Sequence, residues 1–264
     1  MYAFQYSRAK STADAAKAAS TDAEAKLLAG GMTLIPTLKQ RLAKPTALID
    51  LNGIADLKGI KRDGNSLVIG AMTRHAEVER SKDVKDMIPA LAHLASLIGD
   101  PAVRNRGTIG GSIANHDPAA DYPAGALGLG ATVTTNKRKI AADDFFTGMF
   151  STALEDGEII TSVSFPKPDK AAYMKFKNPA SRYAIVGVFV AKTGNAVRVA
   201  VTGAGAGVFR SKELESALAK SFLPTAVEGI KIASDGLNSD IHASAEYRAH
   251  LITVMAKRAV VACG

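Results

Sequence analysis

The sequence predicts an α+β protein that combines a small parallel or mixed sheet with antiparallel hairpins and a helical tail. Strand and helix patterns alternate in the N-terminal segment, which favours β-α-β connections. Turn residues at 63–65 and 193–195 separate apolar runs and predict antiparallel hairpins. Helical spacing of apolar residues follows from Ser211 to the C-terminus. These three observations together indicate a mixed fold of more than one sheet.

The N-terminal segment has the order helix, strand, helix, strand. Its predicted elements are an Ala-rich helix capped by Ser11 or Thr12, a buried strand over 26–29, a helix with Leu34, Leu38 and Leu42 on one face that stops before Pro45, and a strand over 47–51. Pro36 is compatible with the first turn of that second helix, where its missing N–H is not needed.

The pattern changes at Leu57, where hairpins and capped helices take over. The predicted elements are strands 59–62 and 66–70, a helix capped by Thr73, a helix from Pro89 that ends at Gly99, a strand over 131–135 with a basic turn after it, and a strand over 158–165. The Pro- and Lys-containing stretch 166–170 is typical of a linker. We therefore expect domains over 1–166 and 167–264, the first divided into subdomains of about 1–56 and 57–166.

The C-terminal segment begins with strands and ends with helices. Its predicted elements are strands 184–191 and 196–202, a helix over 214–218 capped by Ser211, a helix over 227–232 capped by Thr225, and a long helix from Ser244 that buries Tyr247, Leu251, Val254 and Met255. The Gly-rich stretch 203–207 is interpreted as a plain loop, because no phosphate-binding Lys follows it.

Two Gly-Gly turns follow apolar runs, at Gly30-Gly31 and at Gly110-Gly111. Such turns permit positive φ and close approach of a ligand. Their successive N–H groups can point into one concavity and bind an anion, and a helix start favours the same ligand. Neither turn has the spacing of a dinucleotide fingerprint or a P-loop. As a pair, they suggest two backbone cradles for one elongated ligand that contains a pyrophosphate.

Composition narrows the possible functions. The chain has 264 residues, 47% of them hydrophobic, and a net charge of +8, which suits an anionic cofactor or an acidic partner. No apolar run approaches the ~20 residues of a membrane span, and the N-terminus lacks the regions of a signal peptide, so we expect a cytoplasmic protein. The single Cys263 excludes an internal disulfide or iron–sulfur cluster. The five histidines lack metal-ligand spacing and are expected to be surface or capping groups.

Two motifs carry a family resemblance. The stretch 28–36, with Lys39, Arg41 and Leu42, and the stretch 108–121 resemble the two flavin motifs of the FAD-binding medium subunits of molybdenum hydroxylases, the family of aerobic carbon monoxide dehydrogenase and xanthine dehydrogenase. The resemblance extends over 156–160 and the Tyr247-Arg248 region. It implies a two-subdomain FAD-binding domain of the vanillyl-alcohol-oxidase (PCMH) type and a C-terminal domain of antiparallel sheet and helices. Met32 departs from the family pattern, in which His or a small polar residue is frequent.

The resemblance also implies a set of FAD-binding residues. Asp121 is expected to accept hydrogen bonds from the ligand or an adjacent group, or to cap a helix. Ile160 is expected to lie against the flavin ring or in the core, and either Lys175 or Lys177 to lie near the electron-rich edge of the ring or in solvent. The other implied contacts are Ala29, Gly30, Gly31, Met32, Thr33, Leu34, Thr108, Gly110, Gly111, Ser112 and Asn115.

The implied function is electron transfer, with the chemistry carried by non-covalent FAD and no catalytic side chain in this chain. A large partner subunit would hold the molybdenum cofactor and a small one two [2Fe-2S] clusters, in a dimer of heterotrimers. Electrons would pass from the clusters through FAD to an external acceptor that the sequence does not identify.

Two other functions are compatible with the sequence. One is a stand-alone flavoenzyme similar to UDP-N-acetylenolpyruvoylglucosamine reductase, which would turn over without partner chains. The other is a basic nucleic-acid-binding module, although the chain has no tryptophan for base stacking. A yellow protein that co-purifies with two further chains would favour the subunit over both.

Overall fold

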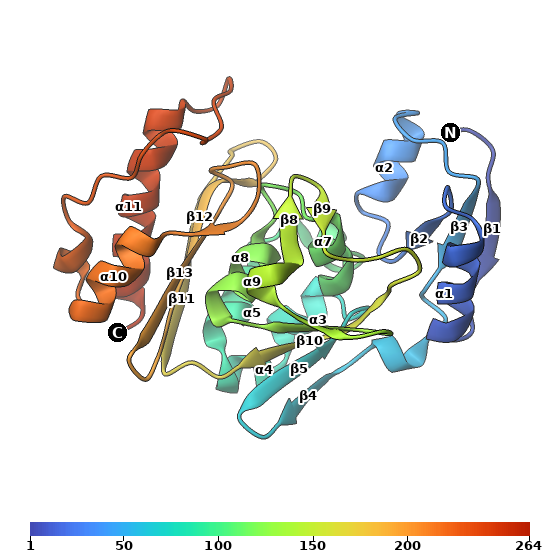
Figure 1. The fold of residues 1–264 in the computed structure, drawn as a ribbon, viewed down its shortest axis with the longest axis horizontal. Coiled ribbons are helices and arrows are strands. Elements are labelled where there is room, and N and C mark those ends of the chain that lie inside the picture. Colours follow the sequence, from blue (N-terminus) through green and yellow to red (C-terminus); the bar gives the residue numbers. More distant parts are fainter.

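The computed structural model describes residues 1–264 and contains three sheets of three or more strands (Figure 1). In Figure 1 the N-terminal sheet lies on the right, a central sheet with its helices in the middle, and the C-terminal sheet with two helices on the left. The mixed α+β architecture expected from the sequence is confirmed. None of the helices is both long enough and apolar enough to cross a membrane.

The N-terminal sheet is parallel, in the strand order β1-β3-β2. Its elements are β1 (Gln5–Arg8), α1 (Thr12–Thr21), β2 (Lys26–Leu28), α2 (Leu34–Lys39) and β3 (Ala47–Asp50). The Ser11 side chain accepts a hydrogen bond from the backbone N of Asp14, so Ser11 rather than Thr12 caps α1. The predicted β-α-β order is confirmed, and β1 is an additional exposed edge strand that the sequence pattern did not indicate.

The central sheet is antiparallel, in the order β4-β5-β10-β6-β7. The sheet strands are β4 (Ile60–Asp63), β5 (Ser66–Gly70), β6 (Thr132–Thr135), β7 (Lys139–Ala141) and β10 (Ile160–Pro166), with a separate hairpin of β8 (Phe146–Gly148) and β9 (Ser151–Thr152). The helices of this part are η1 (Ala55–Leu57), α3 (His75–Arg80), α4 (Lys82–Met87), α5 (Pro89–Ser96), α6 (Pro101–Arg104), α7 (Ile109–Asn115), α8 (Asp121–Leu129) and α9 (Ala142–Phe145). Its apolar cluster contains 31 buried residues and is the largest of the molecule.

Helix α8 packs between the central part and the C-terminal sheet, and all nine of its residues are buried. Two glycines allow this position. A Cβ on Gly128 would lie 2.8 Å from the ring of Phe189 on β12, and one on Gly125 would lie 3.0 Å from Leu94 on α5. The close approach therefore requires glycine on both sides of the helix. It fixes the C-terminal sheet against the central part.

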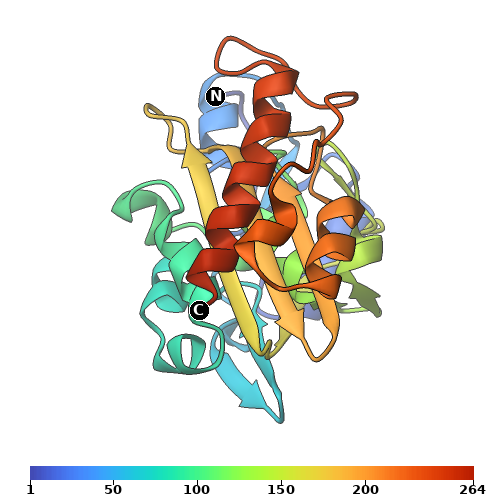
Figure 2. The same cartoon turned by 90° about the vertical axis from the view of Figure 1, so that its left-hand side faces the viewer.

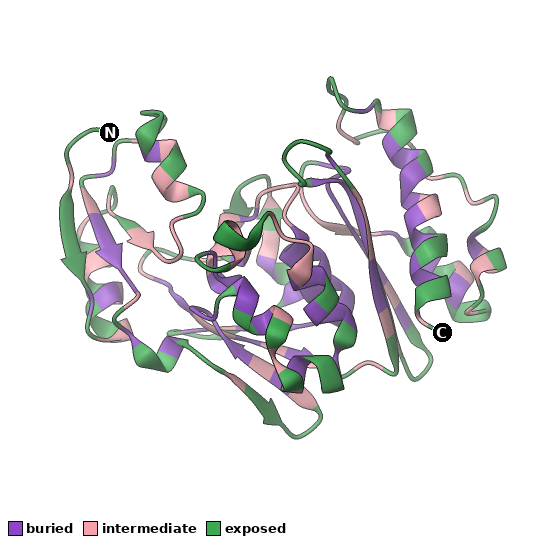
Figure 3. Cartoon of the chain, turned by 180° about the vertical axis from the view of Figure 1, so that it is seen from behind, coloured by how far each residue is buried: buried purple, intermediate pink, exposed green.

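The C-terminal sheet is antiparallel, in the order β11-β12-β13-β14. Its elements are β11 (Lys170–Lys177), β12 (Ala184–Thr193), β13 (Ala196–Thr202), β14 (Phe209–Arg210), α10 (Lys212–Lys220), η2 (Pro224–Val227) and α11 (Ala245–Ala262). Helix α11 crosses the outer face of this sheet (Figure 2), and a buried stripe runs along the helix (Figure 3). Because α8 covers the other face, β12 is apolar on both faces, which explains its unbroken apolar run.

Two predicted details in the first half of the chain are wrong. Helix α2 ends at Lys39, Arg41 takes a positive φ of 60°, and Leu42 is left 73% exposed instead of continuing the helical face. Thr73 does not cap α3, whose N-cap is Arg74. The Thr73 hydroxyl instead bonds to the backbone N and O of Gly59, both at 3.0 Å, and so ties the loop before α3 to the start of the hairpin.

Two predicted details in the second half are also wrong. The helix expected over 227–232 is a 3-10 turn that ends at Val227, and Gly229 takes a positive φ of 79°. In α11, Tyr247 is 44% exposed and Val254 is half-buried, whereas Leu251 and Met255 are buried as expected. Arg248 occupies the buried stripe in place of Tyr247, where its guanidinium donates to the carbonyls of Ile185 and Gly203.

Candidate functional site

A cavity of about 700 Å³ lies where the N-terminal, central and C-terminal parts of the chain meet. This volume is within the range of pockets that bind small molecules and cofactors. Both Gly-Gly turns line the cavity, as do β10, β11 and the loop between β11 and β12. Of the residues expected to bind FAD, every one except Lys177 contributes to the lining. The sequence motifs thus converge on one site although they lie far apart in the chain.

The first turn lines the cavity and contains backbone N–H groups that have no acceptor in the protein. Gly31 has a φ of 74°, which directs the chain into α2. No backbone or side-chain group of the chain accepts from the N–H groups of Gly30, Gly31, Met32 or Thr33. Four successive N–H groups without an acceptor form the kind of concavity that binds anions.

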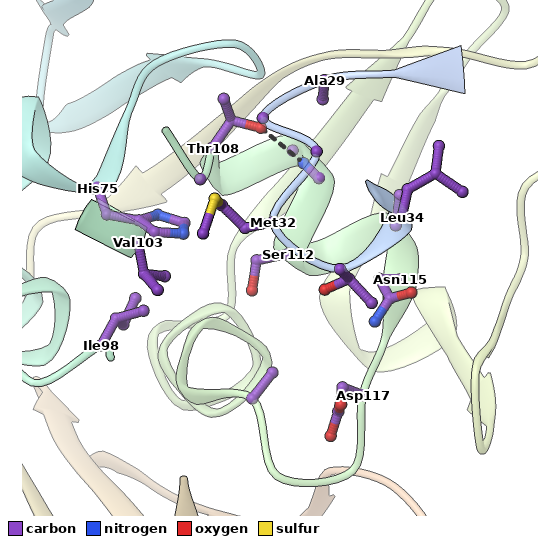
Figure 4. A pocket seen from close by; sticks show the side chains of 18 of the residues that line it. Ala29, Met32, Leu34, His75, Ile98, Val103, Thr108, Ser112, Asn115 and Asp117 are labelled. Carbon is purple, nitrogen blue, oxygen red and sulfur yellow. Dashed lines mark hydrogen bonds between the residues drawn. The ribbon is translucent and has the colours of Figure 1, made fainter. Parts of the chain in front are cut away.

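The second turn is different, because its N–H groups are already used within the protein. Ile109 N donates to Thr73 O at 3.1 Å, and Gly110 N donates to Ala71 O at 2.8 Å. Thr108 caps α7, accepting from Gly111 N at its hydroxyl, 3.2 Å away, and from Ser112 N at its carbonyl, 3.0 Å away (Figure 4). The expectation of two backbone cradles is therefore wrong for the second turn. The backbone donors belong to the first turn alone.

The glycines of the two turns also serve a purpose that the sequence did not reveal. A Cβ on Gly30 would overlap the carbonyl of Arg106, and one on Gly110 would lie 2.6 Å from the side chain of Ala71. A Cβ on Gly111 would lie 3.5 Å from that of Ala29, in the other turn. Glycine is therefore required for the first turn to pack against the loop at Arg106 and for the second turn to pack against Ala71, directly after β5, in addition to any ligand.

Among the residues expected to bind FAD, three polar side chains on the cavity wall have no partner in the protein. They are the hydroxyls of Thr33 and Ser112 and the amide of Asn115, each in the cavity lining and none in a hydrogen bond. Figure 4 shows Ser112 and Asn115 on helix α7, opposite the first turn. Side chains of this kind can both donate and accept. The second turn thus contributes side chains, and the first turn contributes backbone N–H groups.

Asp121 and Lys175 form a buried ion pair in the wall of the cavity. Lys175 Nζ lies 2.9 Å from Asp121 Oδ2 and donates to Leu97 O at 3.1 Å, and Tyr173 Oη donates to Asp121 Oδ1 at 2.5 Å. Burial raises the pKa of Asp121, and the Lys175 cation opposes that shift. Both carboxylate oxygens already accept from the protein, and Asp121 is the first residue of α8 rather than its cap. The expectation that Asp121 caps the helix is wrong. Adjacent groups, Tyr173 and Lys175, donate to its carboxylate as expected, and a hydrogen bond from the ligand stays a prediction.

Lys177 and Ile160 complete the predicted set. Lys177 is exposed at the end of β11 and does not reach the cavity. Ile160, 5% exposed, lies in the cavity lining and in the core cluster at once, so both roles expected for it are compatible with the structure. Met32, the departure from the family pattern, is 36% exposed and points into the cavity (Figure 4).

Comparison with known proteins shows the family of the chain. Residues 2–168 match the family described as FAD binding domain in molybdopterin dehydrogenase, and residues 171–262 match the CO dehydrogenase flavoprotein C-terminal domain. The chain belongs to the FAD-binding medium subunits of the molybdenum hydroxylases. It is 37% identical to the carbon monoxide dehydrogenase medium chain of Hydrogenophaga pseudoflava, over 97% of this chain and 96% of that one. It is 36% identical to the nicotine 6-hydroxylase medium subunit of Paenarthrobacter nicotinovorans, over 99% and 98%.

The fold agrees with this membership. This chain superposes on a chain of the carbon monoxide dehydrogenase structure from Hydrogenophaga pseudoflava that lacks the Mo-pyranopterin moiety. The TM-score is 0.90, and the two sequences are 34% identical. The match covers 99% of this chain and 97% of that one. The two-part architecture expected from the resemblance, an FAD-binding domain followed by a C-terminal domain, is confirmed by the two family matches and by this superposition.

The cavity is also lined by residues that the sequence did not indicate. They include His75, Ile98, Val103, Arg182 and Tyr183. The expectation that every histidine is a surface or capping group is wrong for His75, which is buried without capping a helix. His116 does cap the C-terminus of α7, with a φ of 41°, but it too is buried. No sequence signal marked His75, because it lies outside both glycine motifs.

Proposed function

We propose that this medium subunit binds one FAD non-covalently in the cavity and serves as the electron-transfer subunit of a molybdenum hydroxylase complex. The four unfilled N–H donors of residues 30–33 carry the proposal, because a diphosphate offers the matching acceptors. The hydroxyls of Thr33 and Ser112 and the amide of Asn115 face the same space and add side-chain donors. The residues present therefore fit FAD.

Two residues that could bond covalently to a flavin are engaged elsewhere, which supports non-covalent binding. His116 Nδ1 lies 2.9 Å from Ser151 O, and its Nε2 accepts from Val208 N at 3.4 Å. Cys263 lies at the end of α11, outside the cavity, and burial raises the pKa of its thiol to about 11. Neither side chain is a nucleophile directed at the cavity.

We propose the same contacts with FAD for the other residues that the family resemblance implied. Ala29 and Leu34 flank the donor turn, Thr108, Gly110 and Gly111 shape the facing wall, and Ile160 packs against the ring system. We assign the cationic position beside the flavin to Lys175 rather than Lys177, because only Lys175 lines the cavity. Asp121 and Tyr173 hold Lys175 in that position.

The bound FAD supplies redox chemistry, which allows the subunit to take electrons from iron–sulfur clusters of one partner and deliver them to an external acceptor. We propose a large partner with the molybdenum cofactor and a small partner with [2Fe-2S] clusters, arranged as a dimer of heterotrimers in the cytoplasm. In support, relatives are named as medium chains or subunits, and this chain has no group of His, Cys, Asp and Glu that could hold a metal. Those relatives act on carbon monoxide and nicotine, so we expect the substrate to be selected by a partner.

The test has two parts. The purified chain should bind FAD at one equivalent and turn yellow, and the native protein should co-purify with two further chains that carry molybdenum and iron. A chain without affinity for FAD would overturn the cofactor assignment. A yellow protein that reduces its substrate without other chains would instead support the stand-alone reductase.

A single amide tests the location of the cofactor. Asn115→Leu should weaken FAD binding about two- to tenfold, the effect of one neutral hydrogen bond. Asn195→Leu is the matched control, because Asn195 is exposed in the turn between β12 and β13, outside the cavity. Equal affinities for FAD in the two variants would place the cofactor away from Asn115.

A further inference from the structure

His75 is the first residue of α3 and is enclosed at the edge of the cavity. Only 4% of its surface is exposed, and that part lines the cavity. Its backbone N donates to Gly107 O at 3.0 Å, immediately before the second Gly-Gly turn. The imidazole occupies the space beside Gly107, where a Cβ would lie 2.5 Å from Nε2, and the Tyr122 ring packs against it with centroids 5.2 Å apart. Figure 4 shows the ring beside Val103 and Met32.

Neither ring nitrogen of His75 has a hydrogen-bond partner in the protein. Nδ1 is fully enclosed and unpaired, and no group bonds to Nε2. His116 shows that the same fold can satisfy a buried imidazole, since both of its nitrogens are bonded. A buried polar group without a partner is unfavourable, and in a native protein it requires an explanation, such as strain, a bound water or ion, or a functional role. His75 is thus an unfilled polar group at the edge of a ligand cavity.

The environment keeps His75 neutral. Burial, together with the nearby Arg104 cation, lowers its pKa to about 4. Arg104 is itself paired with Glu79, at 2.8 Å, so it is not available as a partner for the ring. A neutral imidazole carries one N–H and one lone pair. Because an unfilled buried N–H is rarer than an unfilled acceptor, the hydrogen belongs on Nε2 rather than on the enclosed Nδ1.

We propose that His75 is a cofactor-binding residue whose Nε2–H donates a hydrogen bond to the flavin nucleotide in the cavity. The inference rests on the proposed function, because it requires FAD in this cavity. It explains why a polar imidazole occupies a buried position where an apolar side chain would make the FAD-free protein more stable. The ligand supplies the missing hydrogen-bond partner. It also extends the site beyond both glycine motifs to the start of α3.

The decisive experiment compares His75→Leu with wild type in the full-length chain, for stability without FAD and for affinity toward FAD. Leucine removes the unpaired nitrogens at similar volume, so the FAD-free variant should unfold at the same or a higher urea concentration than wild type. Its dissociation constant for FAD, followed by flavin fluorescence, should rise about three- to tenfold. A histidine retained for structure, for example through a water shared with Tyr122, would give the opposite result: a less stable variant with unchanged affinity.

Two further variants sharpen the test. His75→Gln can present an N–H near the position of Nε2 and should recover part of the affinity, whereas His75→Asn reaches only the position of Nδ1 and should not. His93→Leu, on the exposed side of α5, is the matched control and should bind FAD as wild type does. Wild-type affinity in His75→Leu would overturn the inference while leaving the proposed function intact. Failure of wild type itself to bind FAD would overturn the proposed function.

Discussion

Lys175 Nζ lies 2.9 Å from Asp121 Oδ2, and this contact links strand β11 of the C-terminal sheet to the first residue of α8 in the central part. Both side chains are almost fully enclosed, at 2% and 5% exposure. The pair therefore closes one wall of the cavity and joins the two parts of the chain that build it. Tyr173, two residues before Lys175, donates to the other oxygen of the same carboxylate.

Asp121→Asn should destabilise the FAD-free protein by about 3–5 kcal/mol, because removal of one partner leaves a buried lysine without a compensating charge. The change is read from the urea dependence of unfolding. Asp86→Asn is the matched control: its partners Lys82 and Arg62 are 86% and 47% exposed, so the loss should stay below about 1 kcal/mol. Equal effects of the two substitutions would show that burial adds nothing to the Lys175–Asp121 pair.

Gly31→Ala should weaken FAD binding, because a side chain is strained at a φ of 74° and would lie 3.0 Å from Ile35, which disturbs the turn that carries the free N–H groups. Gly236→Ala matches its backbone strain, with a φ of 77°, but lies in open space outside the cavity. Titration with FAD should show weaker binding for the first variant alone. If both variants bind FAD equally well, the first turn is not the anion site.

Glu158 should make the protein sensitive to acid. Hydrogen bonds from Arg138, together with the backbone N of Glu155 and the Thr135 hydroxyl, lower its pKa from 4.5 to about 2. A carboxyl whose pKa is lower in the folded state stabilises the fold above pH 4.5, and this contribution is lost as pH falls toward 2. Melting temperatures of Glu158→Gln and wild type should therefore differ most at neutral pH and converge below pH 4.5. A difference that stays constant with pH would exclude this linkage.

Much of the fold could be predicted from the sequence, because turns and helix caps are indicated by residues that are neighbours in the chain. Turn residues between apolar runs marked the hairpins 60–70 and 184–202, and capping residues marked α1 and α11. One prediction that was wrong concerns the end of a helix. Leu42 has the spacing of a helical face, but the chain leaves the helix at Gln40, and a periodic pattern alone does not show where a helix ends.

The choice between Lys175 and Lys177 shows why part of the site could not be predicted. Residues two apart on a strand share one face, so the sequence treats both lysines alike. The pairing of β11 with β12 shifts register between Phe176 and Lys177, which breaks that alternation. Lys175 then meets Asp121, and Lys177 remains in solvent.

By itself, the sequence determined the family, most of the strands and helices and the two glycine turns, since each depends on residues that are neighbours in the chain. Only the tertiary structure decided which turn keeps its N–H groups free, which lysine enters the cavity and which histidine is left unpaired. The physical reason is that hydrogen-bond satisfaction and burial depend on groups remote in sequence. Ala71 and Thr73 accept from the second turn, whereas nothing in the chain accepts from the first.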